Sequence, residues 1–317
     1  MSAVAAFLAL VDLTAPLFLL IAVGFVLSRW GGWPLMAADT LTRFVFTVAI
    51  PTLLFRLMTD FARAPHVDAR LLVAFFGGCF VVYAIARVAA HAIFRMDGAA
   101  QSVFAMGGIF ANNVLLGVPL AKVTLGDASL PAVSLVLVFN SLVLWTLASV
   151  SVEWARHRDL SLKGIGRTIV GVVRNPVVAS ILVGTAFGFT GLTLPRFVDQ
   201  TLSLISQAAI PLSLIALGMG LAGFGAASGW RVSSAMAFAK LVVHPLAVYA
   251  LARLLDLPPL ETTAIVLLAS LPVGANVYLM SRQFDVLTGP VASSIVVTTV
   301  LAALTTPLAL TLCHDPR

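Results

Sequence analysis

Residues 101–122, QSVFAMGGIFANNVLLGVPLAK, form an apolar run whose middle carries glycine, asparagine and proline. A second run of the same kind, residues 261–284, reads ETTAIVLLASLPVGANVYLMSRQF. Proline lacks an N–H and frees a carbonyl, and glycine weakens a helix. Such an interruption at membrane depth is tolerated only where it is buried in protein or lines a watery cavity. The two runs therefore predict two broken membrane helices. We expect the breaks at Gly108, Pro119, Pro272 and Gly274.

The composition of the whole chain indicates a membrane protein. Of its 317 residues, 60% are hydrophobic and only 10% are charged. A soluble domain is about one quarter charged and at most about half apolar, so this chain could not cover its apolar surface with polar side chains. The 19 Lys and Arg residues are scattered between apolar runs, so the net charge of +6 does not indicate a nucleic-acid partner. The sequence predicts an all-α protein in a lipid bilayer.

Apolar runs of about 20 residues recur from end to end, and each is long enough to cross a bilayer. The polar segment 153–174 separates the spans of residues 1–152 from those of residues 175–317, five in each half. We therefore expect two repeats joined by a cytoplasmic linker. The spans, about ten in all, lie near residues 7–28, 37–58, 70–94, 101–121, 130–152, 175–191, 198–222, 231–255, 261–281 and 289–313.

The two halves resemble each other in sequence. Gly24 and Gly184 lie 160 residues apart, and VYAIAR at 82–87 matches VYALAR at 248–253. Such matches in a common order indicate an internal repeat. Because each half holds an odd number of spans, the second half enters the membrane from the opposite side. Inverted repeats of this kind build many secondary transporters, which bind their substrate near the midplane.

Asparagines near both interruptions are candidate ligands for a substrate. The N-terminus of a half-helix presents free N–H groups and a positive dipole end, which suit an anion. Asn112, Asn113 and Asn276 can add neutral donors and acceptors there. The pairs Asn113-Val114 and Asn276-Val277 recur in corresponding spans, so both valines join the predicted site. The alternative is that asparagine links helices and that Pro and Gly are ordinary residues of membrane helices.

Two cationic residues are further candidates for the site. Lys240 lies in the middle of its apolar span, with His244 one turn later. A buried lysine in a membrane is a candidate functional residue by default. It can attract an anionic substrate or occupy a cation site as its own counter-ion; the alternative is a lysine that snorkels or pairs with backbone carbonyls. Arg282 follows the second interruption and can reach back toward it.

The residues that the spans lack narrow the function. No Asp or Glu lies in the middle of a predicted span, which disfavours a two-aspartate sodium–proton antiporter and an aspartyl intramembrane protease. Cys79 and Cys313 lie far apart, with no metal-ligand spacing around them. The chain has no P-loop motif for ATP. We therefore expect no metal, no cofactor and no enzymatic activity.

Four segments in order carry a resemblance to a known family. They are AIPTLLFRLM at 49–58, FANNVLLGVPL at 110–120, RNPVVASILVG at 174–184 and ASLPVGANVYLMSRQF at 269–284. Together they resemble the auxin efflux carrier family, which includes the plant PIN proteins and bacterial carriers of malonate and related carboxylates. Asn112 matches the crossover asparagine of that family, so the role of a substrate-carboxylate ligand carries over to it. Asn276 matches the bacterial pattern only.

The resemblance implies ten helices in two inverted repeats, with the fourth and ninth helices broken and crossing, as in sodium–proton antiporters and bile-acid symporters. Spans 1, 2, 6 and 7 would form a scaffold and a dimer surface, and spans 3–5 and 8–10 a transport domain that moves like an elevator. The short linker favours a bacterial carrier in the inner membrane. Because the inside connections hold more Lys and Arg when the N-terminus is outside, both termini are expected in the periplasm.

The sequence thus predicts a secondary active or facilitative transporter of a small organic anion, either a carboxylate such as malonate or an auxin-like acid. Its expected partners are this anion, the lipid bilayer and a second copy of the chain, with coupling to H⁺ or Na⁺ left open. Two other functions stay open at this point: a sodium-coupled symporter of the bile-acid type, and an intramembrane enzyme.

Overall fold

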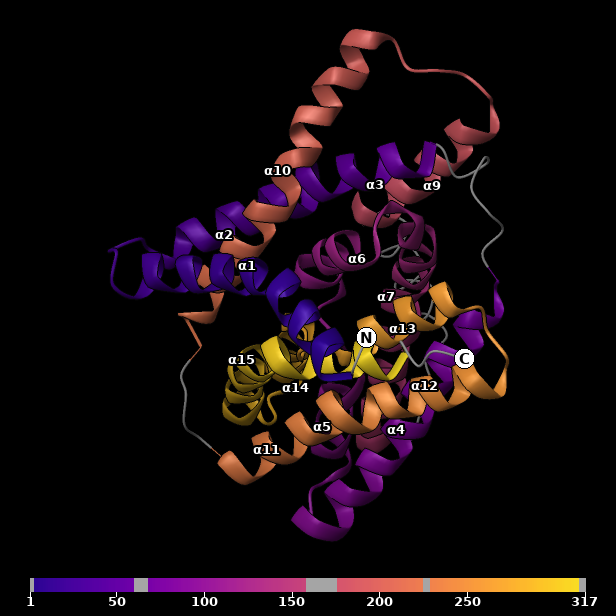
Figure 1. Cartoon of the computed structure of the whole chain (residues 1–317). Coiled ribbons are helices and arrows are strands. Elements are labelled where there is room, and N and C mark those ends of the chain that lie inside the picture. Colours follow the sequence, from indigo (N-terminus) through magenta and orange to yellow (C-terminus); the bar gives the residue numbers. More distant parts are fainter. Residues whose placement is uncertain (1–2, 60–67, 158–175, 225–228, 314–317) are drawn as a thin grey trace.

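The computed structural model describes residues 3–59, 68–157, 176–224 and 229–313. In these residues all regular structure is helical, apart from one isolated bridge between Ala111 and Val273, so the predicted all-α fold is confirmed (Figure 1). The helices in chain order are α1 (Ala3–Arg29), α2 (Leu35–Phe44), η1 (Val45–Ala49), α3 (Ile50–Thr59), α4 (Arg70–Phe94), α5 (Gly98–Ile109), η3 (Asn113–Gly117), α6 (Val118–Leu125), η4 (Asp127–Ser129), α7 (Leu130–His157), α9 (Pro176–Phe189), α10 (Arg196–Leu221), α11 (Trp230–Phe238), η5 (Ala239–Val243), α12 (His244–Leu254), α13 (Pro259–Ser270), α14 (Ala275–Phe284) and α15 (Thr288–Cys313).

Several of these helices are long and apolar enough to cross a membrane, as predicted. In the described part of the chain, six stretches meet this criterion: Phe7–Arg29, Leu35–Thr59, Arg70–Phe94, Arg196–Leu221, Trp230–Leu254 and Thr288–Thr311. Shorter apolar helices lie at Asn113–Leu125, Asp127–Asn140, Pro176–Phe189 and Pro259–Ser270. Each of the shorter helices overlaps one of the remaining spans that the sequence predicts.

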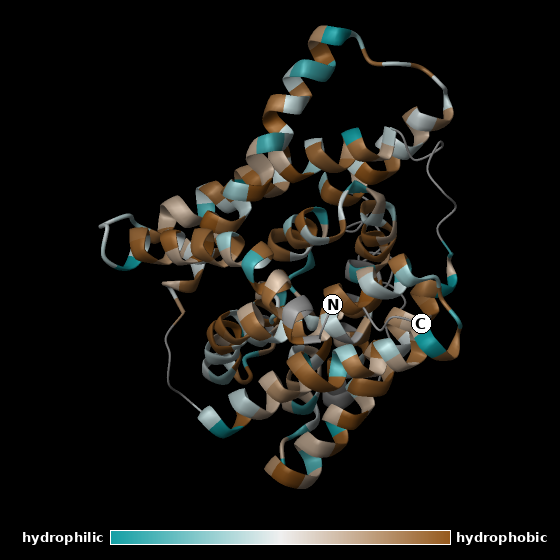
Figure 2. Ribbon diagram, in the orientation of Figure 1, coloured by the Kyte–Doolittle hydropathy of each residue, from teal (hydrophilic) through white to brown (hydrophobic). Residues whose placement is uncertain are grey.

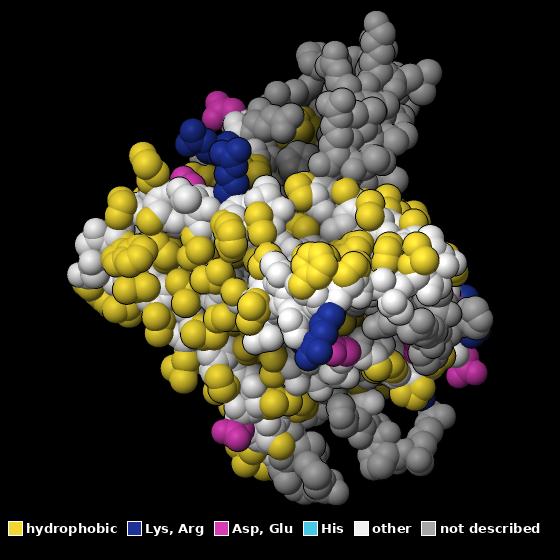
Figure 3. Space-filling view, turned by 90° about the horizontal axis from the view of Figure 1, so that it is seen from above, with side chains coloured by type: hydrophobic (Ala, Val, Ile, Leu, Met, Phe, Trp, Pro, Cys, Tyr) yellow, Lys and Arg dark blue, Asp and Glu magenta, His cyan; other side chains and the backbone are white. Residues whose placement is uncertain are grey.

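Large apolar side chains cover the outside of the helices. Trp30, Val88, Phe197 and Leu204 are among those that are well exposed. Hydrophobic residues dominate the ribbons in Figure 2. In Figure 3, hydrophobic side chains are spread over the described part of the face, where charged groups are few. Exposing apolar surface to water costs about 25 cal/mol per Å², whereas contact of the same surface with lipid acyl chains does not carry this cost. This surface therefore fits a lipid bilayer.

Within the described residues, three apolar segments contain a π-helical turn, and each turn ends two residues before a proline. The pairs of turn and proline are η1 and Pro51, η3 and Pro119, and η5 and Pro245. Proline removes one i to i−4 hydrogen bond, and its ring crowds the carbonyl of residue i−4, so the preceding turn widens. Proline alone is not sufficient, because Pro211 lies inside α10 without such a turn.

The helices pack in two groups (Figure 1). In the upper group of that view, α1 packs along α10, α3 packs along α9, and both α2 and α3 contact α10. In the lower group, α4 packs on α5 and α12, α13 packs on α12 and α15, and α11 packs on α15. α6 and α7 lie between the groups and contact helices of both, and α1 of the upper group also packs directly on α15 of the lower group.

Glycines allow the closest contacts within the upper group. A Cβ atom at Gly24 of α1 would lie 2.1 Å from the carbonyl oxygen of Ile215 in α10. A Cβ atom at Gly184 of α9 would lie 2.6 Å from the carbonyl oxygen of Phe55 in α3. Both distances are too short for any side chain, so glycine is what lets these backbones approach, as is usual between membrane helices. The two glycines that correspond in the sequence halves thus make corresponding contacts.

Candidate binding site at two interrupted helices

Both apolar runs that the sequence singles out are interrupted in the structure. α5 ends at Ile109, and the chain is extended at Phe110 (φ −80°, ψ 104°) before η3 begins at Asn113. α13 ends at Ser270, and the chain is extended from Leu271 (φ −66°, ψ 157°) to Gly274 (φ −76°, ψ 147°) before α14 begins. We call Phe110–Asn112 the first break and Leu271–Gly274 the second break.

The two breaks pair with each other in antiparallel orientation. The N–H of Asn112 donates to the carbonyl oxygen of Pro272 at 3.0 Å, and the N–H of Gly274 donates to that of Phe110 at 2.9 Å. An unpaired backbone group in hydrocarbon costs several kcal/mol, so each break satisfies groups that the other leaves free. A threonine of α15 anchors the second break, because Thr298 Oγ1 accepts a hydrogen bond from the N–H of Val273 at 3.1 Å.

The pairing depends on the absence of a side chain at Gly274. Its φ is one that any residue adopts, but a Cβ atom there would lie 2.9 Å from the carbonyl oxygen of Ala111 and 3.1 Å from its carbonyl carbon. Of the predicted break residues, Pro272 and Gly274 lie in the second break, whereas Gly108 lies in the last turn of α5 and Pro119 in the first turn of α6. The first break therefore falls between these two residues.

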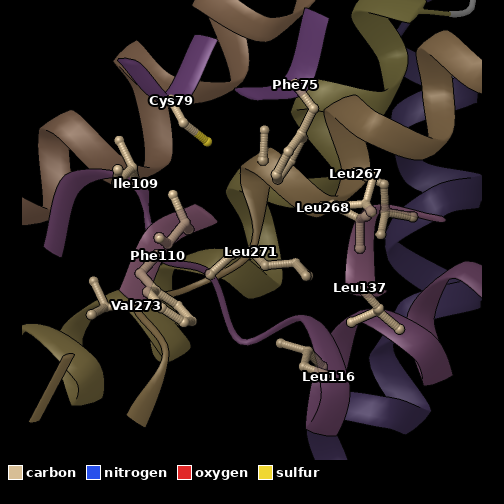
Figure 4. Close-up of a cluster of buried hydrophobic side chains, with 14 of the residues drawn as sticks. Phe75, Cys79, Ile109, Phe110, Leu116, Leu137, Leu267, Leu268, Leu271 and Val273 are labelled. Atoms are coloured by element: carbon tan, nitrogen blue, oxygen red, sulfur yellow. The ribbon is translucent and has the colours of Figure 1, made fainter. Parts of the chain in front are cut away.

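Apolar side chains surround the paired breaks (Figure 4). Phe110 and Val273 from the breaks, Leu116 from η3 and Leu137 from α7 all have at most 4% of their surface exposed. Ala111 is 3% exposed, and Asn112 is 8% exposed. The interrupted backbone is thus enclosed by protein, which is the condition for non-helical chain at membrane depth.

One of the asparagines is held by a residue that the sequence did not single out. Nδ2 of Asn113 donates to Oδ1 of Asn140 in α7 at 3.3 Å, and both side chains are buried. Oδ1 of Asn113 has no hydrogen-bond partner among the described residues. The signal for Asn140 is its position inside the apolar run LVLVFNSLVLW, residues 135–145, where a lone amide needs a partner.

The other two asparagines keep free side-chain amides. The structure records no hydrogen bond from the side chain of Asn112 or Asn276 to any described residue. Asn276 is half-buried in the first turn of α14, next to the exposed Ala275. The first N–H groups of a helix lack intrahelical partners, so this helix start offers backbone donors as well. Val277 is buried in the same turn.

Lys240 lies close to the second break, but its side chain points to the C-terminal end of α13 and not to the start of α14. Its side chain is completely buried, and Nζ donates to the carbonyl oxygen of Ala269, in the last turn of α13, at 2.5 Å. Nζ also lies 3.1 Å from Nδ1 of His244. Arg282 is exposed in the last turn of α14. The structure thus brings Lys240, but not Arg282, into the buried region beside the breaks.

Comparison with known proteins covers nearly the whole chain. The family model described as "Membrane transport protein" matches residues 9–310. A protein of Rhizobium meliloti with the name "Putative malonate transporter" is 28% identical over 303 residues, 92% of this chain and 92% of that protein. A protein of Methanocaldococcus jannaschii named as an uncharacterized transporter is 23% identical over 303 residues, 92% of this chain and 95% of that protein.

Proposed function

The chain belongs to the membrane transport protein family, that of the auxin efflux carriers, and on this premise we propose that it carries a small organic anion, a carboxylate such as malonate, by secondary active or facilitative transport. The observation that carries the proposal is the pair of breaks, which place two half-helix starts and two free asparagine amides in one region. Such discontinuous helices are the usual ligand-binding elements of secondary transporters. The family is one of transporters and not of enzymes.

The asparagines would bind a carboxylate through neutral hydrogen-bond donors, so the site would not need a full positive charge in contact with it. Nδ2 of Asn112 and Nδ2 of Asn276 would each donate to it, together with the N–H groups at the starts of η3 and α14. The dipoles at these starts favour negative charge. Asn113 would be positioned by Asn140, and Val114 and Val277 would supply apolar walls. Lys240 and Arg282 would add positive potential from a distance rather than direct contact.

Transport would use an elevator-like movement of one group of helices against the other. This movement would follow from two inverted repeats that cross at the paired breaks. The corresponding contacts of Gly24 and Gly184 support this relation, because α1 on α10 and α9 on α3 become equivalent when the halves are exchanged. The upper group of helices would then be the scaffold, and the lower group with α6 and α7 the transport domain. We place the protein in a bacterial inner membrane, as a homodimer, with both termini in the periplasm.

One observation favours a second candidate, a sodium-coupled symporter of the bile-acid type. Oδ1 of Asn113 is a buried acceptor without a partner among the described residues. Side-chain and backbone oxygens are the ligands that hold Na⁺ in broken-helix transporters. Sodium dependence of transport separates this candidate from the first.

Uptake into proteoliposomes tests the proposed function. We expect saturable uptake of labelled malonate that unlabelled malate inhibits more strongly than an indole acid does, because the site would be built around a carboxylate and not around an aromatic ring. Protein-free liposomes are the control. If no dicarboxylate or monocarboxylate is taken up or exchanged, the protein is not an organic anion carrier. If uptake requires Na⁺, the symporter is the better description.

A further inference from the structure

We propose that the ammonium group of Lys240 is a built-in cation at the C-terminal end of α13, in the place that a coupling cation would otherwise take, so that the carrier works without Na⁺. This inference rests on the proposed function, since it concerns the ion that such a carrier needs. It starts from the end of α13 that faces the second break, where the structure gathers several oxygen acceptors.

The C-terminal end of a helix is a site for positive charge. Its last carbonyl groups have no intrahelical partners, and the helix dipole places about half a negative charge there. In α13 three of these oxygens have donors: Ser270 Oγ donates to the oxygen of Leu267 at 2.8 Å, Thr306 Oγ1 to that of Ser270 at 3.2 Å, and Lys240 Nζ to that of Ala269 at 2.5 Å. Lys240 supplies the only full charge in this set.

The second acceptor of Lys240 is a histidine in a fixed orientation. Nζ lies 3.1 Å from Nδ1 of His244, and Nε2 of His244 lies 3.3 Å from Sγ of Cys79 in α4. We assign the tautomer from these contacts: an ammonium has no acceptor, so Nδ1 accepts from it and Nε2–H points to sulfur. His244 and Cys79 have no exposed surface. Lys240, His244 and Cys79 thus form a buried, linear chain of contacts.

The positive charge has no carboxylate partner. In the described part of the chain, the basic residues that form salt bridges with Asp or Glu are Arg56, Arg70 and Lys122. Lys240 forms no salt bridge with any described carboxylate. A buried charge without compensation is costly, so the carbonyl end of α13 is the compensating group. Lys240 has no exposed surface, so a substrate anion has no access to Nζ in this arrangement. Lys240 is therefore arranged as a cation in a carbonyl site and not as a ligand of the substrate.

The backbone around Lys240 is built to deliver it to this position. Lys240 lies in the π-helical turn η5, which interrupts the span between α11 and α12. Pro245 cannot donate to the carbonyl of Leu241, and the widened turn follows from that loss. Turns of this kind occur frequently at functional sites. A lysine that merely anchored the span would instead extend its ammonium to the membrane surface.

The experiment uses the full-length protein and its Lys240→Ala and Lys240→Met variants. In proteoliposomes, we expect malonate uptake by the wild type to change by less than about twofold when Na⁺ is replaced by choline, because the site already holds its cation. The Lys240→Ala variant leaves an oxygen-lined space, so its uptake should fall at least about tenfold in choline and return in part with methylammonium or Na⁺. The methionine side chain fills this space without charge, so Lys240→Met should lose uptake in every salt.

Thermal unfolding of the purified proteins gives a readout that does not depend on transport. Ammonium, methylammonium or Na⁺, compared with choline at equal ionic strength, should raise the Tm of Lys240→Ala by roughly 3 °C and leave the wild type and Lys240→Met unchanged. If Lys240→Ala is recovered as folded protein only when purified in an ammonium salt, that result also supports the proposal.

Three outcomes would overturn the inference. The first is wild-type uptake that fails without Na⁺. The second is a Lys240→Ala variant whose uptake and Tm respond to no cation, which would make Lys240 a structural cap of α13. The third is a Lys240→Ala variant that cannot be recovered folded in any salt. Absence of malonate uptake by the wild type would contradict the proposed function, but it would leave the cation-dependent stability as a separate result.

Discussion

Replacing Asn112 and Asn276 together by alanine is expected to raise the half-saturation concentration for malonate uptake roughly 100-fold, or to abolish uptake at concentrations that saturate the wild type. A hydrogen bond to a charged group contributes about 1.5–3 kcal/mol, and about 1.4 kcal/mol corresponds to a factor of ten. Both amides are free of partners in the described structure, so their loss removes ligands without breaking an internal contact. The measurement is uptake of labelled malonate into proteoliposomes over a range of concentrations.

Gln207→Ala is the matched control for this pair. Gln207 is an exposed amide on α10, and its Nε2 donates to Ser203 one turn earlier. The substitution removes an exposed amide of similar chemistry that lies outside both breaks, and it should leave uptake unchanged. Equal uptake by the wild type and the Asn112→Ala, Asn276→Ala double variant would remove both residues from the site.

The second large effect is expected at the close contact of the two breaks. Gly274→Val should lower uptake by roughly 100-fold or more, because the new Cβ would meet the backbone of Ala111 at 2.9 Å and the γ methyl groups would crowd it further. Separating the breaks would also break the backbone hydrogen bonds between Asn112 and Pro272 and between Gly274 and Phe110. Leaving buried partners unsatisfied costs about 1–3 kcal/mol for each bond. Uptake per molecule of purified, monodisperse protein is the measurement.

Gly220→Val controls for the general effect of replacing a glycine in this protein. A Cβ atom at Gly220 in α10 meets nothing within 4 Å, so this variant should transport as the wild type does. The account of the breaks is wrong if Gly274→Val transports normally, or if both variants lose uptake to the same degree.

The sequence was sufficient to locate the interrupted helices, because glycine, proline and asparagine in an apolar run act through local backbone chemistry. It was less accurate on which residues lie in the breaks. Gly108 stays helical at the end of α5. Its neighbour Gly107 leaves room for the side chain of Met236, since a Cβ atom at Gly107 would clash with Sδ of Met236. Pro119 widens the preceding turn η3 rather than ending the helix.

Contacts between distant segments could not be predicted from the sequence. Asn140 is marked in the sequence as a lone amide in an apolar run, but nothing there pairs it with Asn113, which lies 27 residues away. The sequence identified Lys240 by its position but left open what it binds. The contact with Ala269 arises because η5, which carries Lys240, packs on α13. Arg282 was included because it follows the second interruption, yet α14 carries it to an exposed position.

A structure of the protein with malonate bound is the most direct test of the site. It should show one carboxylate of malonate within hydrogen-bonding distance, about 2.7–3.2 Å, of Nδ2 of Asn112 and Nδ2 of Asn276, with Lys240 still on the carbonyl of Ala269. An anion bound elsewhere, whether against Nζ of Lys240 or at the surface beside Arg282, would contradict the proposal that the paired breaks form the substrate site.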